Sequence, residues 1–287
     1  MENTETLDLL FRKAVSAIDD GDQSLLEHIL ISHPGLAGER LCSTGAWLRD
    51  KVGRALDGFF QHPYLLWFVA EDPVRNNKLP LNIAEIARTI ILSAKRQEVN
   101  SLQEQLDYAL RLVSWSWVAR KCNVQIDLID ALVDAGAYSD GVTDDALVNG
   151  NFAAAERLIE RGAKLTLGTA LCLGRWEDVS NLVMTASDSD KQFGLTLSAL
   201  NGKAEALARL IGSGVNLNTP SSNLYSHGTA LHHAVSSGSL DAVKILVEAG
   251  AALDTRDTVY GATPLGWAEY EKHPEISVYL REKGAQQ

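Results

Sequence analysis

Imidazole side chains gather near the carboxyl end of this 287-residue sequence. The group consists of His227, His232, His233 and His273. Histidines at short spacing can bind a metal ion, but the sequence has no HExxH helix and no CxxC pair. Cys42, Cys122 and Cys172 are odd in number and far apart, and we expect them to be buried as small apolar side chains. We expect neither a metal site nor a disulfide framework.

Two carboxylates and a phenol, Asp254, Asp257 and Tyr260, lie in the same region of the sequence. Paired carboxylates can serve as general acid and base. Aspartate also favours turns, because its side chain accepts hydrogen bonds from nearby backbone N–H groups. Nothing in the sequence places a nucleophile beside them, and no GxGxxG, GxxxxGKS/T or GxSxG pattern is present. We interpret the segment as a turn and expect no catalytic residue and no cofactor.

The part of the sequence that carries these residues contains one pattern twice. Thr229 recurs as Thr263 and Gly250 recurs as Gly284, each 34 residues later. A threonine at the start of a helix can cap it, and a glycine at the end permits the left-handed conformation that closes it. A fixed period in the low thirties is typical of helical repeat arrays. Each copy is therefore predicted to be a pair of helices and a turn.

Further glycines at the predicted ends of outer helices extend this pattern upstream. They are Gly136, Gly162, Gly214, Gly250 and Gly284, separated by 26, 52, 36 and 34 residues. Because 52 is twice 26, one repeat boundary should be hidden near Ala186. The short spacings leave room for two helices but not for a long loop that projects from the repeat. We call such a projecting loop a finger, and the fingers of the middle repeats should be short.

Residues 229–232 (TALH) and 263–266 (TPLG) resemble the Thr-Pro-Leu-His start of the ankyrin repeat family, and residues 240–251 resemble its outer helix. The resemblance implies an all-α solenoid of about eight helix pairs, with short β-hairpin fingers only near the carboxyl end. It also implies that His232 braces neighbouring loops by hydrogen bonds. A divergent amino-terminal half before a regular pair resembles bacterial ankyrin-repeat proteins of no assigned activity.

We expect residues 1–100 to form divergent ankyrin-like repeats and residues 101–287 to form the regular array, both as one continuous solenoid. In the first part, helices are predicted over four segments: 7–18, 24–31, 63–70 and 82–94. Apolar side chains at helical spacing support these predictions. The aromatic residues Phe59, Phe60 and Phe68 are assigned to the core.

Trp67, His233 and Trp267 fall at one repeat position, which faces the concave groove in the family that the chain resembles. Exposed aromatic side chains often anchor a partner, although Trp67 would be buried if the amino-terminal repeats are distorted. Four residues of the two long predicted fingers complete the predicted binding surface. They are Tyr225, His227, Asp257 and Tyr260.

The net charge of −11 repels nucleic acid and anionic membranes and favours a basic partner. The amino terminus has no long apolar run, so we expect no signal peptide, no membrane span and a cytoplasmic location. The resemblance implies a protein- or peptide-binding module. Two alternatives remain open at this point. One is an enzyme or small-molecule binder with a pocket between the amino-terminal repeats and the segment 218–227, and the other is a structural assembly subunit.

Overall fold

The computed structural model describes residues 2–286, and these residues form helices and loops without a β-strand. An isolated bridge joins Arg40 to Tyr64. The all-α prediction is thus confirmed. The chain divides into two compact units between Lys164 and Leu165. That boundary does not test whether residues 1–100 are true ankyrin repeats, which stays a prediction.

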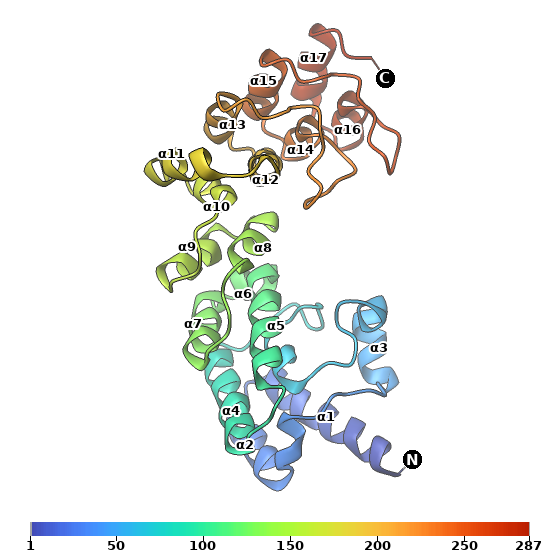
Figure 1. Ribbon diagram of the computed structural model, residues 1–287. Helices are drawn as coiled ribbons and strands as arrows, with labels where there is room; N and C mark the ends of the chain where they lie inside the picture. Colours follow the sequence, from blue (N-terminus) through green and yellow to red (C-terminus); the bar gives the residue numbers. More distant parts are fainter. Residues whose placement is uncertain (1, 287) are drawn as a thin grey trace. The chain divides into compact units, whose positions relative to one another are not determined.

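The described part of the second unit contains four helix pairs (Figure 1). Their helices are α10 (Leu167–Cys172) with α11 (Trp176–Thr185), α12 (Asp188–Leu200) with α13 (Ala204–Ile211), α14 (Ala230–Ser236) with α15 (Leu240–Glu248), and α16 (Pro264–Tyr270) with α17 (Pro274–Glu282). The inner helices α10, α12, α14 and α16 contact one another in chain order. Of the outer helices, α15 packs against both α13 and α17. Each pair therefore buries its apolar faces against its neighbours, as repeat arrays require.

Capping groups begin and end these helices where the sequence predicted. The Thr263 hydroxyl accepts a hydrogen bond from the Gly266 N–H at 3.2 Å. Gly250 and Gly284 have φ of 94° and 95°, a region that a residue with a Cβ rarely adopts. The hidden boundary is also confirmed, because α11 ends just before Ala186 and a capping box at Ser187 begins α12.

Leucines from successive helices form the core of the second unit. Leu231, Leu246, Leu265 and Leu280 are all buried in one continuous apolar cluster. Burying a leucine side chain contributes about 1.5–3 kcal/mol to stability. The core thus supports the inner helices from which the candidate site projects.

Two long loops leave the second unit on the side of α14 and α16, away from the outer helices α13 and α15 (Figure 1). We call residues 218–229 the first finger and residues 254–263 the second finger. They contain no strand, and they are joined by a hydrogen bond from the Thr258 N–H to the His227 carbonyl at 2.9 Å. At the base of the fingers, the Ala252 N–H donates to Asn218 Oδ1 at 2.8 Å.

The first unit repeats the two-row arrangement in less regular form. Its helices are α1 (Glu2–Asp20), α2 (Gln23–Ser32), η1 (Pro34–Ala37), α3 (Ala46–Val52), η2 (Gly53–Asp57), η3 (Leu65–Ala70), α4 (Ile83–Arg96), α5 (Leu102–Trp115), α6 (Trp117–Lys121), α7 (Gln125–Ala135), α8 (Val142–Val148) and α9 (Phe152–Glu160). One row of contacts runs through α1, η3, α5 and α8, and the other runs through α2, α4, α7 and α9. The segment 63–70, predicted as an inner helix, is instead a short 3₁₀ helix.

Four side chains of the first unit differ from their predicted burial: Trp67, Phe59, Cys42 and Cys122. Trp67 is only 5% exposed, because its ring packs against those of Tyr64 and Tyr108 at centroid distances of 5.2 and 4.5 Å. The structure therefore follows the alternative in which Trp67 is buried. Phe59 is 46% exposed, although its ring is in an edge contact with the ring of Trp115. Cys42 is exposed and Cys122 is half-buried, rather than buried.

A buried charged network holds the loop after η3. The side chains of Glu71 and Arg75 are both fully buried and lie 3.1 Å apart. Arg75 also donates to Asp19 Oδ1 at 2.9 Å and to the Phe68 carbonyl at 2.7 Å. Burying a charge is costly unless it is paired and hydrogen-bonded. Both charges are paired here, but Arg75 Nε and Nη1 are buried without a hydrogen-bond partner.

No helix among residues 2–286 combines the length and the apolar character needed to cross a membrane.

Candidate functional site

Asp257 organises the second finger. Its Oδ1 accepts hydrogen bonds from the N–H groups of Val259 and Tyr260 at 2.9 and 2.6 Å, and its Oδ2 accepts from the Ala262 N–H at 3.0 Å. Burial alone would raise the pKa of Asp257, but these N–H groups and the indole of Trp267 lower the pKa to about 2. Asp257 is therefore a structural anion, and the turn interpretation of this residue is confirmed.

The same carboxylate orients Trp267. The indole Nε1–H donates to Asp257 Oδ2 at 3.0 Å, which fixes the ring against the base of the finger. Asp254 is exposed and accepts from the Gln286 N–H at 2.8 Å. The two carboxylates thus hold separate backbone groups.

His232 connects α14 to the second finger, as the family resemblance implied. Its Nδ1 accepts from the Thr229 N–H at 3.2 Å, and its Nε2–H donates to the Ala262 carbonyl at 3.2 Å. Burial lowers the pKa of His232, which keeps the ring in the neutral form with one donor and one acceptor.

His233 differs from its predicted exposure, since only 2% of its surface is exposed. Its Nε2–H donates to the Tyr225 carbonyl at 3.3 Å and so holds the first finger. Burial lowers the pKa of His233 to about 4, because a cation there would lose its hydration. The ring is therefore neutral near pH 7.

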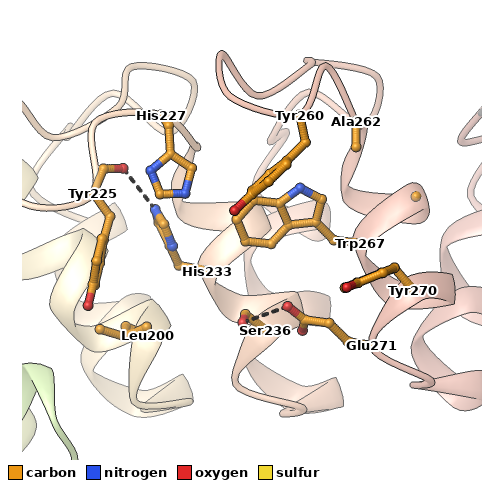
Figure 2. Close-up of a pocket in the computed structure, with 11 residues that line it drawn as sticks. Leu200, Tyr225, His227, His233, Ser236, Tyr260, Ala262, Trp267, Tyr270 and Glu271 are labelled. Carbon is orange, nitrogen blue, oxygen red and sulfur yellow. Dashed lines mark hydrogen bonds between the residues drawn. The ribbon is translucent and has the colours of Figure 1, made fainter. Parts of the chain in front are cut away.

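A cavity of about 600 Å³ opens between these two fingers and the helices α14 and α16 (Figure 2). Five of the residues predicted from the sequence line it: Tyr225, His227, His233, Tyr260 and Trp267. Asp257 does not line the cavity but is hydrogen-bonded to Trp267, which does. Trp67 belongs to the first unit and is not among the lining residues. Every lining residue comes from the second unit.

The rings of the cavity contact one another edge to face and face to face. Trp267 stacks on His227 with centroids 5.8 Å apart, and Tyr260 meets the edge of Trp267 at 6.5 Å. The ring centroids of Tyr225 and His233, which also line the cavity, lie 5.8 Å apart. Aromatic pairs in these geometries stabilise each other and hold one another in place.

Six further lining residues were not predicted: Leu200, Ser236, Ala262, Gly266, Tyr270 and Glu271. The Ser236 hydroxyl donates to Glu271 Oε1 at 3.0 Å, and Figure 2 shows this pair below Trp267. Tyr270 and Glu271 follow Trp267 by three and four residues, a spacing that places them on the same helical face. Applying that period from Trp267 would have found both.

The site contains one carboxylate and no lysine or arginine among the described residues that line it. Within residues 2–286, no group of three histidine, cysteine, aspartate or glutamate side chains is placed to hold a metal ion. The arrangement is an open, aromatic-walled recess with a carboxylate, which suits binding of a ligand with apolar and cationic parts.

Comparison with known proteins identifies the repeats. The family described as "Ankyrin repeats (3 copies)" matches residues 195–287. Cyclin-dependent kinase inhibitor 2A of Monodelphis domestica is 33% identical over 125 residues, which cover 42% of this chain and 70% of that protein. Protein phosphatase 1 regulatory subunit 27 of Homo sapiens and of Mus musculus is 48% identical over 56 residues, or 20% of this chain. The chain spans 36% of the length of those two subunits. These similarities support a protein-binding repeat module, and the chain belongs to the ankyrin repeat family.

Proposed function

We propose that this protein binds a protein or peptide partner through the recess between its two fingers and has a non-catalytic role. The observation that carries the proposal is the exposure of aromatic side chains around the cavity. Tyr260 is 76% exposed, Tyr270 is 87% exposed and Tyr225 is 46% exposed. Rigid aromatic side chains contribute large contact areas and lose little conformational entropy on binding.

The hydrogen bonds around the cavity favour binding of a peptide over catalysis of a covalent reaction at this site. Asp257, whose carboxylate could otherwise act as a base, is occupied by four N–H donors, and His232 and His233 each hold a backbone group of a finger. The names of two relatives describe an inhibitor of a kinase and a regulatory subunit of a phosphatase. By analogy, we propose that this chain also acts on another protein. The net charge of −11 favours a basic partner.

A peptide selected from a random displayed library tests this proposal. The affinity of the selected peptide is measured by calorimetry for the wild type, for Tyr260→Ala and for the Tyr260→Ala, Trp267→Ala double variant. Replacing an anchor residue by alanine should weaken the binding free energy by on the order of 2 kcal/mol, which raises Kd roughly thirtyfold. Tyr260→Ala removes an exposed ring, so the variant should fold normally.

Tyr138→Ala is the matched control, since Tyr138 is a 72% exposed tyrosine in the first unit. The control should bind the peptide like the wild type. Selected peptides that bind the double variant with full affinity would place the binding surface elsewhere. Loss of thermal stability in Tyr260→Ala, comparable to its loss of affinity, would mean that the ring supports the fold instead.

A further inference from the structure

Aromatic residues make up much of the cavity wall. Trp267 contacts the rings of both His227 and Tyr260, and the cavity continues to the exposed ring of Tyr270. The face of an aromatic ring carries negative electrostatic potential, most strongly for tryptophan, and attracts a cation within about 6 Å of its centroid. An uncharged apolar side chain would use the area of these rings but not their potential.

Glu271 adds a formal negative charge to the same cavity. Its side chain is 28% exposed, and Oε1 accepts from the Ser236 hydroxyl at 3.0 Å while Oε2 lies 3.6 Å from His273 Nε2. The serine fixes the carboxylate with lone pairs still available for a ligand. His233 is neutral near pH 7, because burial lowers its pKa to about 4, so this ring does not repel a cation.

We propose that the cavity binds an arginine side chain of the partner, with the guanidinium against the ring of Trp267 and hydrogen-bonded to the carboxylate of Glu271. This inference rests on the proposed function and names the chemistry that the site recognises. Guanidinium is planar, stacks on aromatic faces and presents paired N–H donors to a carboxylate. The ammonium of lysine holds its hydration shell more strongly, which disfavours it in an aromatic recess. The volume of about 600 Å³ leaves room for the arginine stem and adjoining peptide backbone.

A set of capped pentapeptides tests the assignment directly. The probes are acetyl-Gly-Gly-X-Gly-Gly-amide with arginine, lysine or citrulline at X, titrated by NMR while the indole N–H resonance of Trp267 is followed. The Trp267→Phe variant identifies that resonance. The arginine peptide should saturate the shift, with a Kd on the order of millimolar. Citrulline keeps the shape but not the charge and should bind at least tenfold more weakly, and lysine should fall between the two.

Glu271→Gln is the decisive variant, because the amide oxygen can still accept from Ser236 while the charge is removed. It should weaken the arginine peptide about tenfold and leave the citrulline peptide unchanged. Glu275→Gln is the control, since Glu275 is an exposed acid in the first turn of α17. It should bind like the wild type.

Equal affinity for arginine and citrulline peptides, or an unchanged Kd in Glu271→Gln, would overturn the arginine assignment. A lysine peptide that binds more tightly than the arginine peptide would overturn it as well. These failures are separable from failure of the proposed function. If library-selected peptides still lose affinity in Tyr260→Ala, the binding surface stands and only its ligand chemistry is wrong.

Discussion

Replacing Asp257 with asparagine should loosen the second finger and the wall of the cavity together. The carboxylate accepts two N–H groups on each oxygen: those of Val259 and Tyr260 on Oδ1, and those of Ala262 and the Trp267 indole on Oδ2. An asparagine amide has one oxygen, so either orientation satisfies two donors and turns an NH₂ group toward the other two.

The magnitude follows from the two lost bonds. A hydrogen bond to a charged group contributes about 1.5–3 kcal/mol, so losing two costs about 3–6 kcal/mol. The finger can relax toward solvent, which places the expected destabilisation near the lower end, at about 3 kcal/mol. Because repeats depend on their neighbours, the loss should appear first in α16 and α17.

Urea unfolding, followed by circular dichroism, measures the free energy of unfolding of the Asp257→Asn protein. Hydrogen exchange of residues 256–267 shows whether the destabilisation lies in the second finger. The matched control is Asp254→Asn, because the amide oxygen can still accept from the Gln286 N–H. This exposed position should change stability by less than about 0.5 kcal/mol.

An Asp257→Asn protein that unfolds at the wild-type urea concentration, with unchanged exchange in the finger, would refute the reasoning. The pH dependence offers a second check. The pKa of Asp257 is lowered to about 2, so its contribution is present above the unfolded value near 4 and is lost as the pH falls toward 2.

Three further substitutions or conditions test other parts of the fold. Leu246→Ala should destabilise the second unit by about 2–5 kcal/mol in urea unfolding, since the side chain is fully buried. The pKa of His233 is lowered to about 4, so unfolding takes up a proton below about pH 6.5. The melting temperature should therefore fall between pH 6.5 and 4, less steeply in His233→Gln. Arg75→Met should lower the free energy of unfolding by about 3–5 kcal/mol in urea, because it removes the cation that pairs with the buried Glu71 carboxylate.

Exposed positions with similar side chains serve as controls for the two substitutions of buried residues. Val278→Ala removes an apolar side chain that is 53% exposed, and Arg88→Met breaks an exposed pair with Glu85. Both should change stability by less than about 0.5 kcal/mol. If Leu246→Ala or Arg75→Met behaves like its control, the corresponding burial is wrong. A melting temperature equally sensitive to pH in His233→Gln would assign the titration to another group.

The regular repeats were predictable because local chemistry determines them. Thr263 caps a helix and Gly250 ends one through interactions within a few residues of each, so these signals survive in the sequence. The first unit carries such signals at Gly136 and Gly162, but they do not specify its long-range contacts. The burial of Trp67 depends on Tyr64 and Tyr108, which come from η3's flank and from α5, and no spacing in the sequence indicates that contact.

The candidate site was predictable in the same uneven way. Tyr225, Tyr260 and Trp267 were found by repeat position and finger length, and all three line the cavity. The burial of His233 was missed, because its cover comes from the first finger folding back to offer the Tyr225 carbonyl. Glu271 was missed because its importance comes from Ser236, a residue of the preceding repeat.

The first finger is held from both sides before any partner arrives. The inner helix α12 has 13 residues, against 7 in α14 and in α16, and its first turns reach the finger. Ser189 Oγ accepts from Asn223 Nδ2 at 3.2 Å, and on the other side the Thr258 N–H bonds to the His227 carbonyl. A binding surface that is already rigid forfeits little entropy when it is occupied. Most of the entropic cost of binding would then fall on the partner. Constraining a peptide ligand to its bound conformation should therefore raise the affinity more than any substitution that makes this protein more rigid.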